Sequence, residues 1–176
     1  MVDAMTLENY WNLIDRLAVQ MDGEAVLNGS SEHAAIINER MFNYAKSAMR
    51  ILTRRFDPRI YGTESLIKSA TLFAGQNDRK TQVLLEEYEV DELARHPFYE
   101  AFWEASNVEF RQMPAVAAEK NHINFTTMDQ QSYRFERDKK KAVAVAAFGS
   151  DFAKDLNGYF DAIWSFSKPI SLRVGA

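Results

Sequence analysis

Residues 122–148 read HINFTTMDQQSYRFERDKKKAVAVAAF, and they contain three strand-like runs separated by short polar turns. The runs span residues 123–128, 133–136 and 142–148. Connections this short join neighbouring antiparallel strands, because a parallel crossover needs roughly a dozen residues or more. The stretch therefore predicts an antiparallel meander within a larger sheet.

Upstream of this stretch, helical and strand-like patterns alternate. Apolar residues at three- and four-residue steps predict helices, and short apolar or alternating runs predict strands. The expected helices cover residues 4–21, about 31–45, 63–73, 91–105 (with a break before Pro97) and 150 to the residue before Pro169; the expected strands cover 25–27, 48–54, 81–85 and 108–113. This order predicts a single α/β domain in which a mixed sheet is flanked by helices on both faces.

Composition excludes several classes of protein. The 176 residues contain no Cys, which rules out disulfides, thiolate metal sites and a cysteine nucleophile. The net charge of −4 and the pI of about 5.4 do not suggest a strongly basic nucleic-acid-binding domain. No apolar run reaches the ~18 residues of a membrane span, and no signal peptide is visible at the N-terminus. We expect a cytoplasmic protein without a membrane span.

One stretch carries a candidate chemical motif, in which His122, Asn124 and Asp129 have the spacing His-x-Asn-x4-Asp. His122 and Asn124 are two residues apart in the expected strand, which would place both side chains on one face. Asp129 would lie at the following turn. The three scattered His residues form no metal-ligand pattern, so we predict neither a metal nor another cofactor.

This pattern resembles the signature of the phospholipase D-like superfamily, which is His-x-Lys-x4-Asp on a late strand. The order of elements from about residue 46 to 167 is also similar, especially to small, degenerate members of the superfamily. The further segments that carry the resemblance are Arg54-Arg55-Phe56-Asp57-Pro58, Tyr133-Arg134-Phe135-Glu136 and the aromatic C-terminal helix.

The resemblance implies a phospholipase D-like domain over residues 46–176, preceded by a helical extension over residues 1–45. It also implies a chemistry in which His122 attacks phosphorus and a second histidine protonates the leaving group. Lysines would neutralise phosphoryl charge, Asp129 would orient the motif, and no metal would be needed. Because the chain has one motif where this chemistry uses two histidines, the resemblance predicts a homodimer with apposed sites.

Two departures from the signature argue against catalysis. Asn124 replaces the lysine, and loss of a preorganised stabilising donor costs about 10²–10³ in rate. Glu136 falls near the position of a small Gly-Ser step, where its charge would repel a phosphate, although Arg137 can compensate. We therefore predict a catalytically degenerate binding or regulatory module for a phosphate-containing ligand or nucleic acid. His122, Asn124, Glu136 and Arg54 would line its pocket.

Arg54 and Arg55 follow the strand at 48–54, and ligands of α/β proteins bind at the carboxyl ends of strands. With Asp57 nearby, these side chains are candidates for the ligand-binding site. The alternative is a solvated pair of arginines with an ion pair to Asp57.

Two other functions remain open at this stage. The first is a metal-independent phosphodiesterase or nuclease with His122 as nucleophile. The second is a protein-interaction subunit, in which the aromatic helices at 91–105 and after residue 150 form a surface for a protein partner. The basic turn at 137–141 would touch nucleic acid or simply be solvated.

Overall fold

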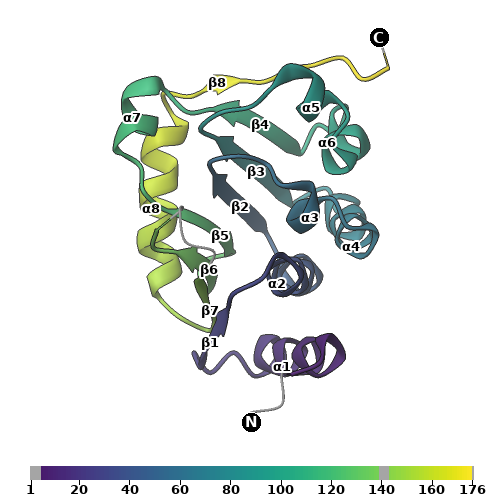
Figure 1. The fold of residues 1–176 in the computed structure, drawn as a ribbon, viewed down its shortest axis with the longest axis vertical. Helices are drawn as coiled ribbons and strands as arrows, with labels where there is room; N and C mark the ends of the chain where they lie inside the picture. Colours follow the sequence, from purple (N-terminus) through teal and green to yellow (C-terminus); the bar gives the residue numbers. More distant parts are fainter. Residues whose placement is uncertain (1–4, 139–142, 176) are drawn as a thin grey trace.

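The computed structural model describes residues 5–138 and 143–175, and within these residues one mixed sheet forms the centre of the molecule (Figure 1). The strand order is β1-β7-β6-β5-β2-β3-β4-β8. The strands are β1 (Ala25–Asn28), β2 (Ala48–Thr53), β3 (Lys80–Leu85), β4 (Val108–Gln112), β5 (Asn124–Met128), β6 (Ser132–Glu136), β7 (Ala144–Phe148) and β8 (Lys168–Pro169). The predicted single α/β domain with a mixed sheet is confirmed.

The sheet has a parallel part and an antiparallel part. β2, β3 and β4 are parallel neighbours, whereas β5, β6 and β7 form the antiparallel meander expected from the short turns. β5 pairs with β2 in antiparallel orientation and joins the two parts. The amino end of β5 and the carboxyl ends of β2 and β6 therefore lie side by side, at the same end of these central strands.

Helices cover both faces of the sheet, with α1, α2 and α4 on one side and α8 on the other (Figure 1). The helices are α1 (Leu7–Gln20), α2 (Ser31–Tyr44), α3 (Pro58–Tyr61), α4 (Glu64–Ala74), α5 (Val90–Ala94), α6 (Pro97–Phe102), α7 (Ala115–Lys120) and α8 (Phe152–Trp164). Thr63 and Ser30 cap α4 and α2 through their side-chain oxygens.

The two helical layers bury alternate residues of the central strands. Ile51 and Val83 face the larger core with α1, α2 and α4, whereas Leu52, Leu84 and Phe125 face α8. Burial of both faces explains the continuous apolar run Val83-Leu84-Leu85 in the second half of β3, as expected for a central parallel strand.

The structure differs from the sequence-based prediction at several elements. The expected helix at 91–105 has its predicted break before Pro97 and forms two short helices, because the residue before Pro97 is kept out of the helical conformation. The helices α3 and α7 and the two-residue strand β8 were not predicted. The basic turn is described only for Arg137 and Asp138, and Lys139–Lys141 lie outside the described residues.

The first 45 residues contribute to the same sheet. β1 pairs with β7 at the edge of the sheet, and α2 packs within the larger core. The predicted division of the chain into a helical extension over residues 1–45 and a phospholipase D-like domain over residues 46–176 stays a prediction.

Candidate functional site

A cavity of about 480 Å³ opens at the carboxyl end of β2. Its walls come from the start of α2, the loop after β2, α3, the start of β5 and the end of β6. Arg54, Arg55, Asp57, Asn124 and Glu136, all named above as candidate site residues, line this cavity together.

Asn124 and Glu136 are paired across the β5–β6 hairpin and bind one another. Asn124 Nδ2 donates to Glu136 Oε2 at 2.8 Å, and Asn124 Oδ1 accepts from the Arg54 backbone N–H at 3.0 Å. The amide thus connects the hairpin to the loop after β2. One bond from Nδ2 and one bond to Oδ1 therefore hold the Asn124 side chain, and the amide brings no charge to a ligand.

Arg134 is a buried arginine beneath this pair. Its Nη2 donates to Glu136 Oε1 at 2.6 Å, and its Nε donates to Asn28 Oδ1 at 3.0 Å. Only 5% of the Arg134 side chain and 12% of the Glu136 side chain is exposed. Both carboxylate oxygens of Glu136 are therefore occupied, one by Arg134 and one by Asn124.

Three more arginines surround the mouth of the cavity. Arg54 and Arg55 both donate through Nε to Glu87 Oε1, at 2.9 Å each, and about half or more of each arginine side chain is exposed. Arg59 binds the Asp57 carboxylate, with its Nη2 2.7 Å from Asp57 Oδ2. The alternative, an ion pair of these two arginines with Asp57, is therefore wrong, because Arg54 and Arg55 bind Glu87 and Asp57 binds Arg59.

These contacts shift the pKa values of the carboxylates. Burial raises the pKa of Asp57, but hydrogen bonds from Arg59 outweigh it and bring the value below its usual range. The hydrogen bond from Arg55 likewise lowers the pKa of Glu87. Both carboxylates remain negatively charged at neutral pH. Because exposed ion pairs contribute only ~0–1 kcal/mol, the arginines at the mouth can exchange these partners for an anionic ligand.

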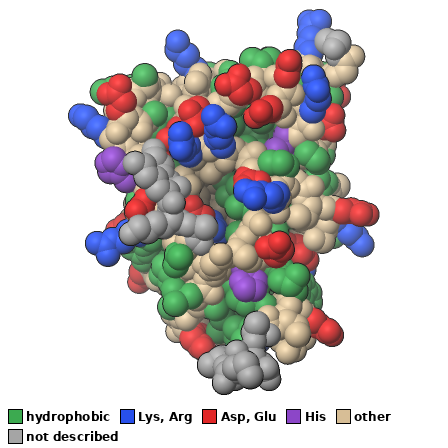
Figure 2. Space-filling model, viewed as in Figure 1, with side chains coloured by type: hydrophobic (Ala, Val, Ile, Leu, Met, Phe, Trp, Pro, Cys, Tyr) green, Lys and Arg blue, Asp and Glu red, His purple; other side chains and the backbone are tan. Residues whose placement is uncertain are grey.

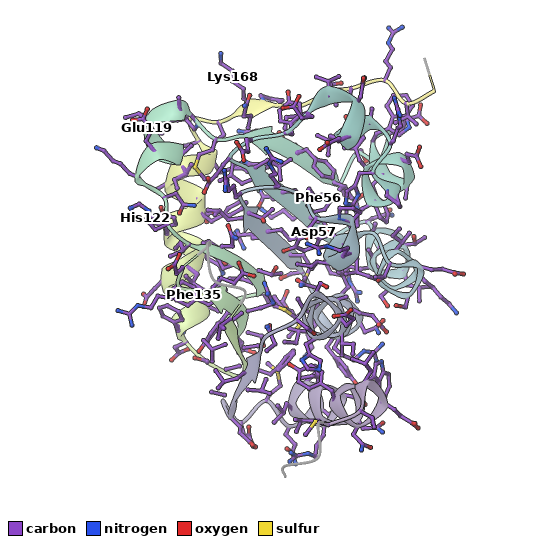
Figure 3. The ribbon with its side chains drawn as sticks, in the orientation of Figure 1. Phe56, Asp57, Glu119, His122, Phe135 and Lys168 are labelled. Carbon is purple, nitrogen blue, oxygen red and sulfur yellow. The ribbon has the colours of Figure 1, made fainter. Side chains whose placement is uncertain are left out.

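His122 lies outside this cavity. It is exposed and precedes β5, so the prediction that it shares the strand with Asn124 is wrong. The physical reason is local, because Asn121 Nδ2 donates to the Ile123 carbonyl at 2.8 Å and residues 121–123 form an irregular segment before the strand. Figure 3 shows His122 at the side of the molecule near α7 and α8, pointing outward and well separated from Asp57.

Asp129 lies at the other end of β5, after the strand, and is also outside the cavity. Its carboxylate accepts backbone N–H groups of Lys46, Ser47 and Ala48 at 2.8–2.9 Å. Burial raises its pKa, but these hydrogen bonds outweigh burial and lower it. Asp129 thus fixes the start of β2 to the β5–β6 turn. Arg137 is exposed just after β6 and does not line the cavity.

Several lining residues were not expected from the sequence. Arg59 and Tyr61 come from α3, and the first residues of α2 reach the cavity from a distant part of the chain. Tyr61 is buried, and burial raises the pKa of its hydroxyl. Arg134 could have been identified, since it is two residues from Glu136 and alternate strand residues share a face.

Figure 2 shows the charge pattern of this face of the molecule, where Lys and Arg side chains gather beside Asp and Glu side chains. Across residues 5–138 and 143–175, no group of three or more His, Asp or Glu side chains is arranged to hold a metal ion. In the same residues, no helix is both long and apolar enough to cross a bilayer.

Residues 30–173 match the family described as "Domain of unknown function (DUF7931)". The chain belongs to this family. No curated protein matches the sequence.

Solved structures show the fold of this family member. TrmBL2, described as an archaeal chromatin protein with a novel mode of DNA binding, is 12% identical, with a TM-score of 0.63 over 90% of this chain. The chain spans about 60% of the length of TrmBL2.

Two shorter proteins match along almost their whole length. NucT from Helicobacter pylori is 10% identical, with a TM-score of 0.61 over 85% of this chain and 100% of NucT. Nuc from Salmonella typhimurium, described as a phospholipase D family member, is 12% identical, with a TM-score of 0.56 over 84% of this chain and 99% of Nuc. The fold of the DUF7931 chain is phospholipase D-like, as the sequence resemblance implied.

The buried pair of Arg134 and Glu136 generates a prediction for stability. Glu136→Ala leaves the buried guanidinium without its carboxylate, and we expect the free energy of unfolding to fall by about 3–5 kcal/mol. Urea denaturation at neutral pH measures this loss. Glu87→Ala is the matched control, because Glu87 also binds arginine but is 41% exposed, and it should cost at most about 1 kcal/mol. Equal losses in the two variants would contradict the conclusion that Arg134 depends on Glu136 as its buried carboxylate partner.

Proposed function

We propose that this DUF7931 chain is a noncatalytic domain that binds a phosphate-containing ligand in the cavity at the end of β2. The observation that carries the proposal is the state of Asn124, which stands where the resemblance expects a lysine. The Asn124 side chain donates to Glu136 and accepts from the Arg54 backbone N–H, while His122 lies outside the cavity.

The exposed arginines at the mouth of the cavity favour an anion. Four arginines and three carboxylates line the cavity, and a fourth carboxylate, Glu87, binds two of the arginines from outside the lining. Arg54 and Arg55 share the single carboxylate of Glu87, so their combined charge is only partly neutralised. Guanidinium groups bind phosphate oxygens in a bidentate manner and are suited to this role.

The start of α2 adds backbone donors to the same cavity. Gly29, Ser30, Ser31 and Glu32 line the wall, and a helix N-terminus presents N–H groups with a favourable dipole for an anion. The Ser30 side chain already accepts from the His33 N–H, so it caps the helix. The Glu32 carboxylate accepts from its own backbone N–H and from Ser31 Oγ at this end of the helix, so a phosphate bound by the arginines would displace it from these donors.

The described lining residues that could act as nucleophiles are already hydrogen-bonded, and the only hydroxyl among them that donates to a carboxylate is Ser31, whose Oγ lies 3.4 Å from Glu32 Oε2. Asp57 is bound by Arg59, and Glu136 by Arg134 and Asn124. Thr53 Oγ1 donates to the Arg55 carbonyl at 2.9 Å. Burial raises the pKa of the Tyr61 hydroxyl, which makes it a poor nucleophile near pH 7. Hydrolysis of a bound diester is therefore not expected.

The phosphate can belong to a small molecule or to nucleic acid, and TrmBL2, which shares the fold, is described as binding DNA. The sequence-based predictions of a homodimer and of a protein partner stay predictions. The alternatives of a phosphodiesterase with His122 as nucleophile and of an interaction subunit are separated from our proposal by the two experiments below.

Binding is tested by NMR titration of ¹⁵N-labelled protein with inorganic phosphate, a mononucleotide, and single-stranded and duplex DNA. We expect saturable shifts at the backbone amides of Arg54, Arg55 and Ser31. Arg54→Gln should weaken binding about tenfold, the effect of losing one charge-assisted contact. Arg16→Gln, the same substitution at an exposed site on α1, should leave affinity unchanged. Equal weakening by both variants, or no shift with any probe, would contradict the proposal.

Catalysis is tested with a chromogenic phosphodiester and with both forms of DNA, in the presence of a chelator. We expect the wild type and His122→Ala to show the same background rate, because His122 is remote from the cavity and Asn124 supplies no cation. Turnover by the wild type that disappears in His122→Ala would establish the phosphodiesterase alternative instead.

A further inference from the structure

The cavity at the end of β2 has an exposed mouth and a buried floor. The three arginines of its mouth have side chains that are each more than half exposed. Tyr61 and Arg134 line the same cavity, yet only 3% and 4% of these residues is exposed, and together they form its floor. The volume of about 480 Å³ lies within the ~300–1,000 Å³ of typical ligand sites, so a phosphate fits together with an organic group.

Arg134 has one guanidinium nitrogen that its own network does not use. Nε and Nη2, which form one edge of the planar group, donate to Asn28 and Glu136. Nη1 makes no hydrogen bond with any described residue and, unlike Arg40 Nε, it is not cut off from solvent. Because Arg134 lines the cavity, Nη1 offers two N–H donors to a ligand at the floor.

The two bonds that Arg134 already makes hold this donor in place. Glu136 Oε1 and Asn28 Oδ1 accept from it at 2.6 and 3.0 Å, and both acceptor residues lie in strands of the sheet. A side chain that is fixed before binding loses little conformational freedom when a ligand arrives. Arg134 is therefore better preorganised than the exposed arginines of the mouth, which must first exchange Glu87 or Asp57 for the ligand.

The carboxylates around the cavity make the direction of the donors more important than the total charge. Four arginines are balanced by the three lining carboxylates and Glu87. Glu136 offsets the charge of Arg134, and each of its oxygens already accepts a hydrogen bond. An anion is therefore bound well only if its oxygens reach several guanidinium groups at once.

A terminal phosphate meets this condition better than a phosphate within a chain. A phosphomonoester has three oxygens without a substituent and a charge of about −1.5 to −2 at neutral pH. Its oxygens can contact Arg134 at the floor and the arginines of the mouth together. A phosphodiester has two such oxygens, and its two organic groups extend to either side and hold the phosphorus near the mouth.

We propose that the cavity recognises a terminal phosphate, in which a phosphomonoester accepts hydrogen bonds from Arg134 Nη1. This inference rests on the phosphate binding proposed above and adds the class of phosphate and the residue that selects it. The phosphomonoester belongs to a small molecule or to the end of a nucleic-acid strand, because both present the same group to the floor.

NMR titration with methyl phosphate and dimethyl phosphate compares the two classes of phosphate with the smallest organic groups. We expect the wild type to bind methyl phosphate at least about tenfold more tightly, the effect of one additional charge-assisted contact. Arg134→Gln combined with Glu136→Gln replaces the ion pair by two amides and leaves the net charge of the protein unchanged. This double variant should lose the preference. Arg54→Gln, at the mouth, should weaken both ligands and keep the preference.

A second measurement observes Arg134 in the wild type and decides the question if the double variant fails to fold. The Arg134 Nε–H is buried and bonded to Asn28, so its ¹H–¹⁵N signal is protected from exchange with water. We expect a saturable shift of this signal with methyl phosphate and none with dimethyl phosphate. A DNA hexamer with and without a 5′-phosphate identifies the source, because tighter binding of the phosphorylated strand than of methyl phosphate indicates a nucleic-acid end.

The outcomes separate this inference from the proposed function. Equal affinity of the wild type for both phosphates, a preference that persists in the folded double variant, or equal binding of the two hexamers would overturn the inference and leave phosphate binding at the mouth intact. An Arg134 signal that does not move with methyl phosphate would do the same. No binding of either phosphate would overturn the proposed function, and this inference with it.

Discussion

The buried guanidinium of Arg134 is the constraint on which the site depends. A charge at this depth requires a carboxylate partner, and Glu136 provides it from two residues along the same strand. The pairing of Asn124 with Glu136 across the hairpin then requires a side chain that donates without adding charge. Asn124 meets this requirement and also accepts from the loop after β2. The network that stabilises the cavity thus occupies the place where the resemblance expects catalytic groups.

The elements with strong local signals were predictable from the sequence. The short turns fixed the meander, and the side chains of Thr63 and Ser30 marked the starts of two helices. α7 was missed because its AVAAEK sequence buries no residue and so has no amphipathic pattern. β8 has only two residues and pairs with β4 solely because of the path of the chain after α8. Neither α7 nor β8 therefore has a local sequence pattern from which it could be predicted.

The candidate site was predicted in part, for a similar reason. Strand ends identified Arg54, Arg55 and Asp57, and the motif spacing identified Asn124 and Glu136; all five line one cavity. The spacing also placed His122 there, but spacing cannot reveal that the strand begins at Asn124. The contributions of α2 and α3 were hidden because their distance along the chain conceals their proximity in the fold.

The most direct test of the account is a crystal structure of the protein soaked with tungstate, an electron-dense analogue of phosphate. The account predicts anomalous density in the cavity at the end of β2, in contact with Arg54 or Arg55 and within reach of the first amides of α2. It also predicts that Asn124 and Glu136 keep their hydrogen bond in that complex. Density bonded to His122, with no tungstate in that cavity, would contradict the proposal that the domain binds a phosphate group there without catalysing its hydrolysis.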